Sequence, residues 1–446
     1  MKQLLLILSI TTLLFSCSQD KNTAQLAPKD PNAYKASIDS LFNAYEKSGA
    51  FMGSIALSHK GEAIYTMAIG FDDIETKKKS DVNTKYRIGS VSKTYTSVLI
   101  FKAIEENKLT LEQTIESYFP AVENANDITV AQLLQHRSGI PNFTSDPIFF
   151  NYHTQYTSPE EMLALISALG SDFAPDSKGE YSNSNYFLLA QILEKVYKAS
   201  YEMLLEEKIW TPLNLKNTYA AKAVSLTNNE AYSYDYNTEW VKLPETDMSI
   251  TKGAGSIVSS PSEVNKFMEA LFAGEIVSAQ SLALMKTVED EYGMGLARYK
   301  INDRQGFGHR GTLDGYKTTA IYFANEKLAI TIASNATKDN NINEIFVEVL
   351  KLYLNDAPIE ASEEEVKKFT GIYISPEDND SLVFIQDKNV LVLVIKNEFK
   401  EPLVYKGNNR FVFEQLYVES RSHTFSSDGT QLTLEQGDYK GTYIKK

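Results

Sequence analysis

The sequence has little cysteine and few histidines, and both scarcities limit its chemistry. Its only cysteine, Cys17, excludes a disulfide within the chain. The histidines are scattered and do not have the spacing of zinc ligands, so we expect no metal and no other cofactor. The five histidines are His59, His136, His153, His309 and His423.

Basic residues are also too few to balance the acidic ones. The chain has 44 Lys and Arg against 58 Asp and Glu, which gives a formal net charge of −14. A surface this acidic repels phosphate backbones, so we expect no nucleic-acid partner. Glycine and proline are not enriched, and 43% of the 446 residues are hydrophobic. The composition therefore indicates a folded protein with a large core and two or three domains, or one large and one small.

The one long apolar run lies at the N-terminus, between Leu4 and Phe15, after Lys2 and just before Cys17. It is too short for a permanent membrane helix and is typical of a signal peptide. Residues 1–17 resemble a bacterial lipoprotein signal, in which Cys17 is lipidated and becomes the mature N-terminus. The alternative is a plain secretory signal with an incidental cysteine. We therefore expect an exported protein, at the periplasmic or cell surface, that contacts a membrane through its lipid anchor only.

The next part of the chain combines helical and strand patterns. A polar linker over 18–32 leads into residues 33–356, where strands are expected near both ends and helices between them. This arrangement favours an α/β (α+β) fold, with one mixed sheet built from both ends of the region, flanking helices and a helical region. Expected strands are "SIALSHKGEAIYTMAIG", "GYKTTAIYFAN" and "LAITIASNA"; expected helices include "TSVLIFKAIEEN", "NYFLLAQILEKVYK", "SEVNKFMEALF" and "NINEIFVEVLKLYL".

The composition changes at "NDAPIEASEEE", and residues 362–446 are rich in short strand patterns separated by turns. A small all-β domain or barrel is expected there. Its segments "FTGIY" and "YKGTY" are similar to those of lipocalin-like β domains. Substrate gating, partner binding and stabilisation all remain open as its role.

The most reactive pattern is Ser90-Val91-Ser92-Lys93. A serine must lose its proton as it attacks, and residues three apart on a helix face the same way. A partly desolvated lysine has a lowered pKa, so its neutral amine can accept that proton. The same spacing also occurs at Ser18–Lys21 and Ser249–Lys252, so the pattern alone does not identify a site.

Two further motifs distinguish this copy of the pattern. Tyr181 and Asn183 form Tyr-x-Asn, and His309 and Gly311 form His-x-Gly, in that order after Ser90. With the flanking stretches "ITVAQLLQHRSGIP" and "GAGSIVSSPSEV", they make the chain from about Phe51 to Asn340 resemble the β-lactamase-related serine hydrolases. That family includes class C β-lactamases, penicillin-binding proteins, D-aminopeptidases and esterases.

The resemblance implies a role for each matching residue. Ser90 would be the acylated nucleophile, with Lys93 as its proton partner. Tyr181 would help to activate the serine and protonate the leaving group. A tyrosine would need nearby cations to favour its phenolate, so whether Lys93 or Tyr181 takes the first proton stays open. Asn183 would steady Lys93 and donate to a substrate carbonyl.

The remaining roles concern the third motif and its neighbours. His309 and Gly311 would bind substrate from the sheet edge beside the cleft. The backbone N–H groups of Ser90 and Thr312 would form the oxyanion hole. His136 resembles the histidine of a family loop motif and is interpreted as structural, holding a loop beside the cleft.

His309 departs from the lysine usual in true class C β-lactamases. A neutral imidazole attracts a substrate carboxylate only weakly, although Arg310 could restore positive charge if it faces the cleft. The leading hypothesis is therefore an exported serine hydrolase that acts on D-amino-acid peptides, amides or small esters rather than β-lactams, with peptidoglycan fragments as possible substrates. A catalytically silent ligand-binding or cell-wall-binding protein is the alternative. A Ser-His-Asp hydrolase is disfavoured, because Ser90 does not lie in G-x-S-x-G.

Overall fold

The structure is a computed structural model. It describes residues 33–301, 304–338, 342–355, 360–395, 399–413, 421–436 and 439–446. The expected signal over 1–17 with Cys17, and the linker over 18–32, lie outside the described residues. Within the part that is described, no helix is both long and apolar enough to cross a membrane.

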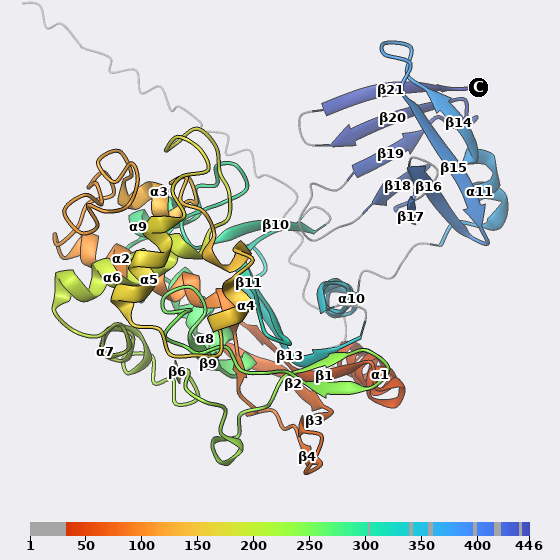
Figure 1. The fold of residues 1–446 in the computed structure, drawn as a ribbon. Helices are drawn as coiled ribbons and strands as arrows, with labels where there is room; N and C mark the ends of the chain where they lie inside the picture. The colour runs from red at the N-terminus through yellow and green to blue at the C-terminus, as the bar shows by residue number, and fades with distance from the viewer. Residues whose placement is uncertain are drawn as a thin grey trace, which may run out of the picture.

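A six-stranded sheet forms the centre of the larger part of the molecule (Figure 1). Its strands come from both ends of this part, as the sequence predicts, because β1 pairs with β13 at Ile55–Ile332. In spatial order they are β10 (Ala297–Ile301), β11 (Arg304–Leu313), β12 (Tyr316–Phe323), β13 (Leu328–Thr337), β1 (Phe51–His59) and β2 (Glu62–Ile69).

The predicted fold class is confirmed, with one correction of detail. The sheet was expected to be mixed, but all five of its pairings are antiparallel. The physical reason is the length of the connections. Only a few residues of sequence separate β1 from β2 and each of β10–β12 from the next strand, and a parallel neighbour would need a long crossover.

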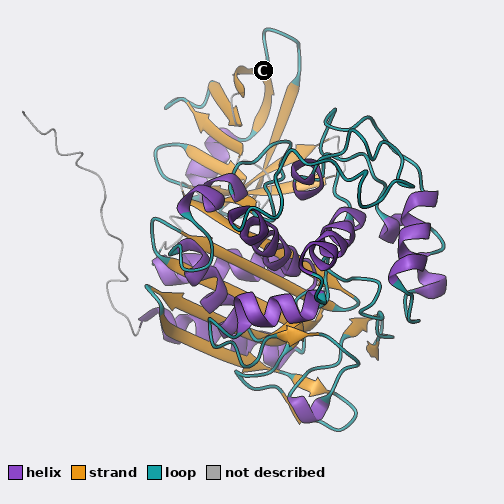
Figure 2. Cartoon of the chain, turned by 90° about the vertical axis from the view of Figure 1, so that its left-hand side faces the viewer, coloured by secondary structure: helices purple, strands orange, loops and turns teal. Residues whose placement is uncertain are grey.

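Helices cover both faces of the sheet, which lies between them in Figure 2. On one face, α1 (Ala33–Ser48) and α10 (Ile342–Leu354) pack together and form a core with the sheet around Phe42, Ile55, Ile330 and Phe346. On the other face, α8 (Pro261–Phe272) contacts β1, β12 and β13.

The helical region packs beyond α8 and supplies the largest core cluster, which includes Leu99, Leu133, Leu189 and Phe267. Its main helices are α2 (Ser92–Glu105) and α6 (Asn183–Tyr197), both almost wholly buried. The other elements are η1 (Gly89–Val91), α3 (Val130–Leu134), η2 (Phe143–Ser145), α4 (Phe149–Tyr152), α5 (Pro159–Ala168), α7 (Tyr201–Leu205), η3 (Glu206–Trp210), η4 (Leu226–Asn228) and α9 (Ala279–Met285).

Short strands join the helical region to the sheet. The segment before the Ser90 motif is held in a three-stranded sheet with the order β5-β9-β6, and two small hairpins lie outside it. These strands are β3 (Phe71–Asp73), β4 (Lys78–Lys79), β5 (Tyr86–Arg87), β6 (Tyr219–Ala220), β7 (Tyr234–Tyr236), β8 (Trp240–Lys242) and β9 (Ile257–Ser259).

The C-terminal part is a closed barrel of eight antiparallel strands, preceded by α11 (Glu363–Phe369). Its core includes Phe369, Phe384, Leu391 and Phe425, separate from the cores around the sheet. This is the small all-β domain expected from the turn-rich sequence. The strands are β14 (Gly371–Ile374), β15 (Ser381–Asp387), β16 (Val390–Ile395), β17 (Phe399–Tyr405), β18 (Arg410–Phe413), β19 (Arg421–Phe425), β20 (Gln431–Gln436) and β21 (Tyr439–Lys445).

Candidate active site

Ser90 lies in the short 3₁₀ turn η1, between β5 and the first turn of α2. Gly89 has φ = +52°, a conformation that glycine adopts without strain. A Cβ there would lie 2.8 Å from the Thr312 amide nitrogen of β11, and a Cβ on Gly311 would lie 1.9 Å from the Ile88 carbonyl oxygen. Because these two glycines have no Cβ, the backbone of β11 can lie in direct contact with the backbone of η1.

Lys93 is fully buried, with 0% of its surface exposed. Its Nζ lies 2.7 Å from Asn183 Oδ1, 2.8 Å from the Ala254 carbonyl oxygen and 2.9 Å from Ser90 Oγ. Burial lowers the pKa of Lys93 well below its usual value. A neutral amine has two hydrogens, which Asn183 and Ala254 accept, so its lone pair faces the Ser90 hydroxyl.

Asn183 begins α6 and is fixed from several sides. Its amide N–H donates to Asn142 Oδ1 at 3.0 Å, and its Nδ2 donates to Thr144 Oγ1 at 3.0 Å. The Oδ1 atom is therefore the one turned toward Lys93, an orientation assigned from these hydrogen bonds. The expected contact between Asn183 and Lys93 is present. Thr144 was not predicted from the sequence, because a threonine outside a motif does not by itself indicate a functional site.

Tyr181 completes the group around the serine. Its hydroxyl donates to Ser90 Oγ at 2.7 Å. Burial raises the pKa of Tyr181, and the hydrogen bond to Ser90 opposes this only in part. The Lys93 amine lies 4.9 Å from the centre of the tyrosine ring, yet burial disfavours its charged form, so the cation that a phenolate needs is missing. The arrangement thus favours a protonated tyrosine beside a neutral lysine.

His136 holds the chain on both sides of Tyr181. Its carbonyl oxygen accepts the Glu180 N–H at 2.8 Å, and its Nδ1 accepts the Ser182 N–H at 3.1 Å. Its ring lies 4.5 Å from the tyrosine ring. His136 is buried, and this burial lowers its pKa well below the usual value, so the ring stays neutral. This geometry agrees with the structural role expected for His136.

His309 and Gly311 lie on the part of β11 that extends past its pairing with β10, which ends at Gly308. The His309 Nδ1 lies 2.5 Å from the Arg310 carbonyl oxygen, so Nδ1 carries the hydrogen. Desolvation is the main cause that lowers the pKa of His309 to about 3, so the imidazole is neutral. The ring centre is 6.4 Å from that of Tyr181, which places His309 beside the proposed catalytic group.

Arg310 does not restore positive charge to the cleft. Its side chain points to the other face of β11, where it hydrogen-bonds Tyr299, a member of the core beneath α1 and α10. It is not among the residues that line the pocket at Ser90.

The proposed oxyanion-hole amides lie close together. The Ser90 N–H is in the first turn of η1, where a helix offers no internal acceptor. A Cβ on Gly311 would approach the Ser90 nitrogen to 2.9 Å, just as one on Gly89 would approach the Thr312 nitrogen. Both amides are therefore at the junction of η1 and β11, where a carbonyl oxygen that is attacked by Ser90 can accept from them.

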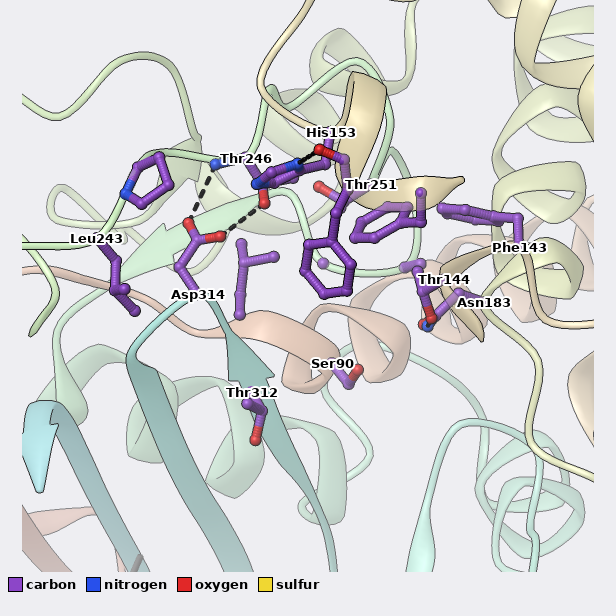
Figure 3. Close-up of a pocket in the computed structure, with 16 residues that line it drawn as sticks. Ser90, Phe143, Thr144, His153, Asn183, Leu243, Thr246, Thr251, Thr312 and Asp314 are labelled. Carbon is purple, nitrogen blue, oxygen red and sulfur yellow. Dashed lines mark hydrogen bonds between the residues drawn. The ribbon is translucent and has the colours of Figure 1, made fainter. Parts of the chain in front are cut away.

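A pocket of about 440 Å³ opens at this junction. Figure 3 shows Ser90 and Thr312 along one side, Asp314 and Thr246 along another, and Phe143, Thr144 and Asn183 along a third. Most of the surface that lines the pocket is apolar, and Phe150 at the rim is 73% exposed. The lining residues are Ser90, Phe143, Thr144, Phe149, Phe150, His153, Asn183, Leu243, Pro244, Thr246, Thr251, Ala254, Gly255, Thr312, Leu313 and Asp314.

The pocket also includes residues that sequence reasoning did not select. Asp314 and Gly315 form the two-residue turn between β11 and β12, and an Asp-Gly pair between two strand patterns is a recognisable turn signal. That signal predicts a turn but not a place beside Ser90. Among the residues that the structure describes, no cluster of three or more His, Cys, Asp or Glu is arranged to hold a metal ion.

Comparison with known proteins agrees with this fold. A family model described as beta-lactamase matches residues 38–346. The teichoic acid D-alanine hydrolase of Staphylococcus aureus is 25% identical over 344 residues, which cover 74% of this chain and 83% of that protein.

Solved structures extend the likeness. The D-amino acid amidase from Ochrobactrum anthropi SV3, complexed with D-phenylalanine, matches with a TM-score of 0.64 and 24% identity over 73% of this chain and 99% of that one. An octameric penicillin-binding protein homologue from Pyrococcus abyssi matches with a TM-score of 0.64 and 22% identity over 91% of this chain and 99% of that one. The second match covers so much of this chain that it extends into the barrel.

Proposed function

The chain belongs to the beta-lactamase family, and we propose that it is an exported serine hydrolase that cleaves D-aminoacyl esters or amides through an acyl-enzyme on Ser90. One observation carries this proposal. The Ser90 hydroxyl lies within hydrogen-bonding distance of a buried lysine amine and a tyrosine hydroxyl at the same time. Serine needs a base to become nucleophilic, and a neutral Lys93 is such a base.

The hydrogen bonds define a path for protons. Ser90 Oγ accepts from the Tyr181 hydroxyl, and its own proton can pass to the lone pair of a neutral Lys93 across the 2.9 Å contact between Oγ and Nζ. Lys93 is therefore the first proton acceptor, since Tyr181 has a raised pKa and still holds its own proton. The lowered pKa of Lys93 and the raised pKa of Tyr181 support this choice between the two acceptors that the motif alone leaves open.

Acylation then follows in two steps. Ser90 Oγ bonds to the substrate carbonyl carbon while its proton moves to Lys93, and the N–H groups of Ser90 and Thr312 bind the resulting oxyanion. The carbonyl carbon then loses the leaving alcohol or amine, which takes a proton from Tyr181. Lys93 returns its extra proton to Tyr181. Water repeats the sequence on the acyl-enzyme and releases the free acid.

The proposed substrate class is supported by the relatives and by the neutral His309 ring beside Tyr181. The relatives' names describe hydrolysis of teichoic acid D-alanine and of D-amino acid amides. Most β-lactams carry a carboxylate, which neutral His309 attracts only weakly. D-aminoacyl esters and amides are therefore the favoured substrates, and β-lactams the disfavoured ones.

Export rests on residues 1–17 and on lipidation at Cys17, which remain part of the proposal. A silent binding protein, the alternative that the sequence left open, has no feature of this site in its favour. A protein that only binds a ligand in this pocket would not need the contacts of Ser90 with Lys93 and Tyr181.

Labelling of the serine tests the proposal directly. The protein is incubated with a fluorophosphonate or a labelled penicillin, and the adduct is located by mass spectrometry. We expect one adduct, on Ser90, and none on a Ser90→Ala variant. A panel of D-alanyl esters, D-amino acid amides, short-chain esters and a chromogenic cephalosporin then ranks substrates. No adduct and no turnover by the wild-type protein, with ligand binding that survives Ser90→Ala, would establish the binding protein instead.

A further inference from the structure

We propose that the acyl group of the substrate carries a free α-ammonium, and that the Asp314 carboxylate receives it. This inference rests on the proposed hydrolysis at Ser90 and names the chemical class of the acyl group. It separates D-aminoacyl substrates with a free amine from N-acylated peptides, whose amide nitrogen carries no charge.

Asp314 lies at the right place in the pocket. It follows Thr312, the proposed oxyanion-hole residue, by two positions on β11 and the turn, so their α-carbons are roughly 6–7 Å apart. Its carboxylate lies along the pocket wall in Figure 3, across the hollow from Asn183 and Thr144. An amine on the carbon next to a carbonyl held at Thr312 is therefore within reach of this wall.

Asp314 is held firmly, so it is positioned before substrate arrives. Thr246 donates to it twice, from its amide at 3.1 Å and from its Oγ1 at 2.6 Å, and Arg87 Nη1 donates at 3.3 Å. The Asp314 side chain is 6% exposed. An ionised carboxylate has about four lone-pair sites, so these three hydrogen bonds leave room for one more donor.

The charge around Asp314 is negative despite the arginine. Arg87 is shared between two carboxylates, because its Nη2 also pairs with Glu245 at 2.7 Å. One guanidinium against two carboxylates leaves a net charge of −1 beside the pocket. An ammonium would balance that charge, whereas a carboxylate would be repelled.

The rest of the pocket lining adds no competing cation. No lysine or arginine is among its residues, and His153 is the only other titratable side chain there. The nearby Lys93 amine and His309 ring are held neutral by burial. Asp314 is therefore the group in this pocket that can select a substrate by charge.

A purely structural role for Asp314 is the competing explanation. Asp314 has φ = +50° in the turn between β11 and β12, a conformation that Asp and Asn both tolerate. Asp314→Asn therefore preserves the turn and can keep the Thr246 contacts, and it removes the charge alone. The structural role predicts no discrimination between charged and uncharged substrates.

The test compares D-alanine methyl ester with methyl propionate, which lacks only the amine. We expect the wild-type enzyme to prefer the amino ester, and the ratio of the two kcat/KM values to fall about tenfold or more in Asp314→Asn, as for loss of a hydrogen bond to a charged group. Glu245→Gln, which neutralises the second carboxylate outside the pocket lining, should lower the ratio by less. Asp235→Asn, an exposed carboxylate on β7, serves as the control and should not change it.

A second measurement needs no variant. The α-ammonium of an amino acid ester loses its proton near the usual α-amino pKa of about 8. The wild-type preference for the amino ester should therefore weaken as pH rises through that value. Hydrolysis of both esters with equal kcat/KM, or a ratio unchanged by Asp314→Asn and by pH, overturns the ammonium site while leaving the hydrolase intact. Failure to hydrolyse either ester, without a Ser90 adduct, overturns the proposed function itself.

Discussion

At the scale of single residues, the chemistry depends on Lys93 being neutral. Replacement by arginine keeps a long basic side chain but fixes its charge, because a guanidinium does not lose its proton in proteins. Lys93→Arg should therefore lower kcat/KM for a D-alanyl ester at least about 100-fold, the usual contribution of a general base. Steady-state kinetics and the rate of Ser90 labelling by a fluorophosphonate check this.

The pH dependence of the wild-type enzyme gives the control. Because burial lowers the pKa of Lys93, the base is already available at neutral pH, and activity should not need alkaline conditions. A rate that climbs steadily toward the usual lysine pKa near 10.4 would contradict this assignment.

Several site residues could be predicted from sequence because their spacing reflects local geometry. Ser90 and Lys93 are three apart, and the order of the motifs selected Tyr181 and Asn183; the structure brings all four into contact. The look-alike pair Ser249–Lys252 is different, since Lys252 binds Glu194 and Ser249 binds Asp247. Thr144 and Asp314 could not be predicted, because common residue types on distant loops carry no signal until the chain folds.

At the scale of elements, the contact between β11 and η1 controls the site. A Cβ on Gly311 would overlap the Ile88 carbonyl oxygen at 1.9 Å. Gly311→Ala should therefore push β11 away from η1 and separate the two oxyanion-hole amides. We expect kcat/KM to fall about 100-fold or more. The free energy of unfolding should fall by about 1–3 kcal/mol, as for an overpacked core. Kinetics and urea unfolding measure the two effects.

Gly61→Ala is the matched control for a lost glycine. Gly61 lies in the turn between β1 and β2 with φ = +85° and open space around its Cβ. Alanine there is strained and should lower stability by about 1 kcal/mol or more. Activity should be retained, because β11 does not move. Equal losses of activity in both variants would mean that general destabilisation, not the β11 contact, explains the result.

Elements with strong periodicity were predictable, and those shaped by function were not. The apolar patterns of α6, α8 and α10 predicted their helices, and alternation and apolar runs predicted β1, β12 and β13. β11 has three glycines beside polar residues, "GFGHRG", because its backbone lies close to η1 at Gly311 and to residues of β12 at Gly306 and Gly308. Glycines at these close contacts take positions where apolar residues would otherwise stand, so the apolar pattern that predicts a strand is missing.

At the scale of the whole molecule, three histidines with lowered pKa values link stability to pH. Burial lowers the pKa of His309 to about 3 and of His423 to about 4, and that of His136 well below its usual value. In the barrel, neither His423 ring nitrogen has a hydrogen-bond partner of good geometry, although the nearby Phe411 backbone raises its pKa slightly. These histidines are therefore protonated at lower pH in the folded chain than in the unfolded chain.

These lowered pKa values decrease the free energy of unfolding as pH falls. Above about pH 6.5 both states hold neutral histidines, so these residues add no pH dependence. As pH falls below that value, the unfolded state binds more protons and the free energy of unfolding decreases, by up to about 1.4 kcal/mol per pH unit for each histidine. For His423 the loss should level off below about pH 4. Urea unfolding between pH 7 and 5 checks the slope.

His423→Phe isolates one contribution. Phenylalanine keeps an aromatic ring beside Phe384, 5.5 Å away, and cannot take up a proton. The variant should lose stability less steeply than the wild type between pH 7 and 5. An identical slope would show that His423 does not contribute.

The family and the fold class, including a small all-β domain at the C-terminus, are confirmed at this scale. The antiparallel sheet is the point at which the expectation of a mixed sheet was wrong. Short connections explain four of the five antiparallel pairings, whereas the pairing of β1 with β13 joins distant parts of the chain, and strand patterns alone do not give its direction.

The pairing of β1 with β13 also sets the timing of folding. Ile55 meets Ile332, so the sheet cannot close until nearly the whole hydrolase part has left the ribosome. At usual synthesis rates this delay is on the order of tens of seconds. During that interval β1 and β2 form at most an isolated hairpin, which is marginally stable in water. A chain that stays unfolded during this interval can still pass through a secretion channel, which admits unfolded chains.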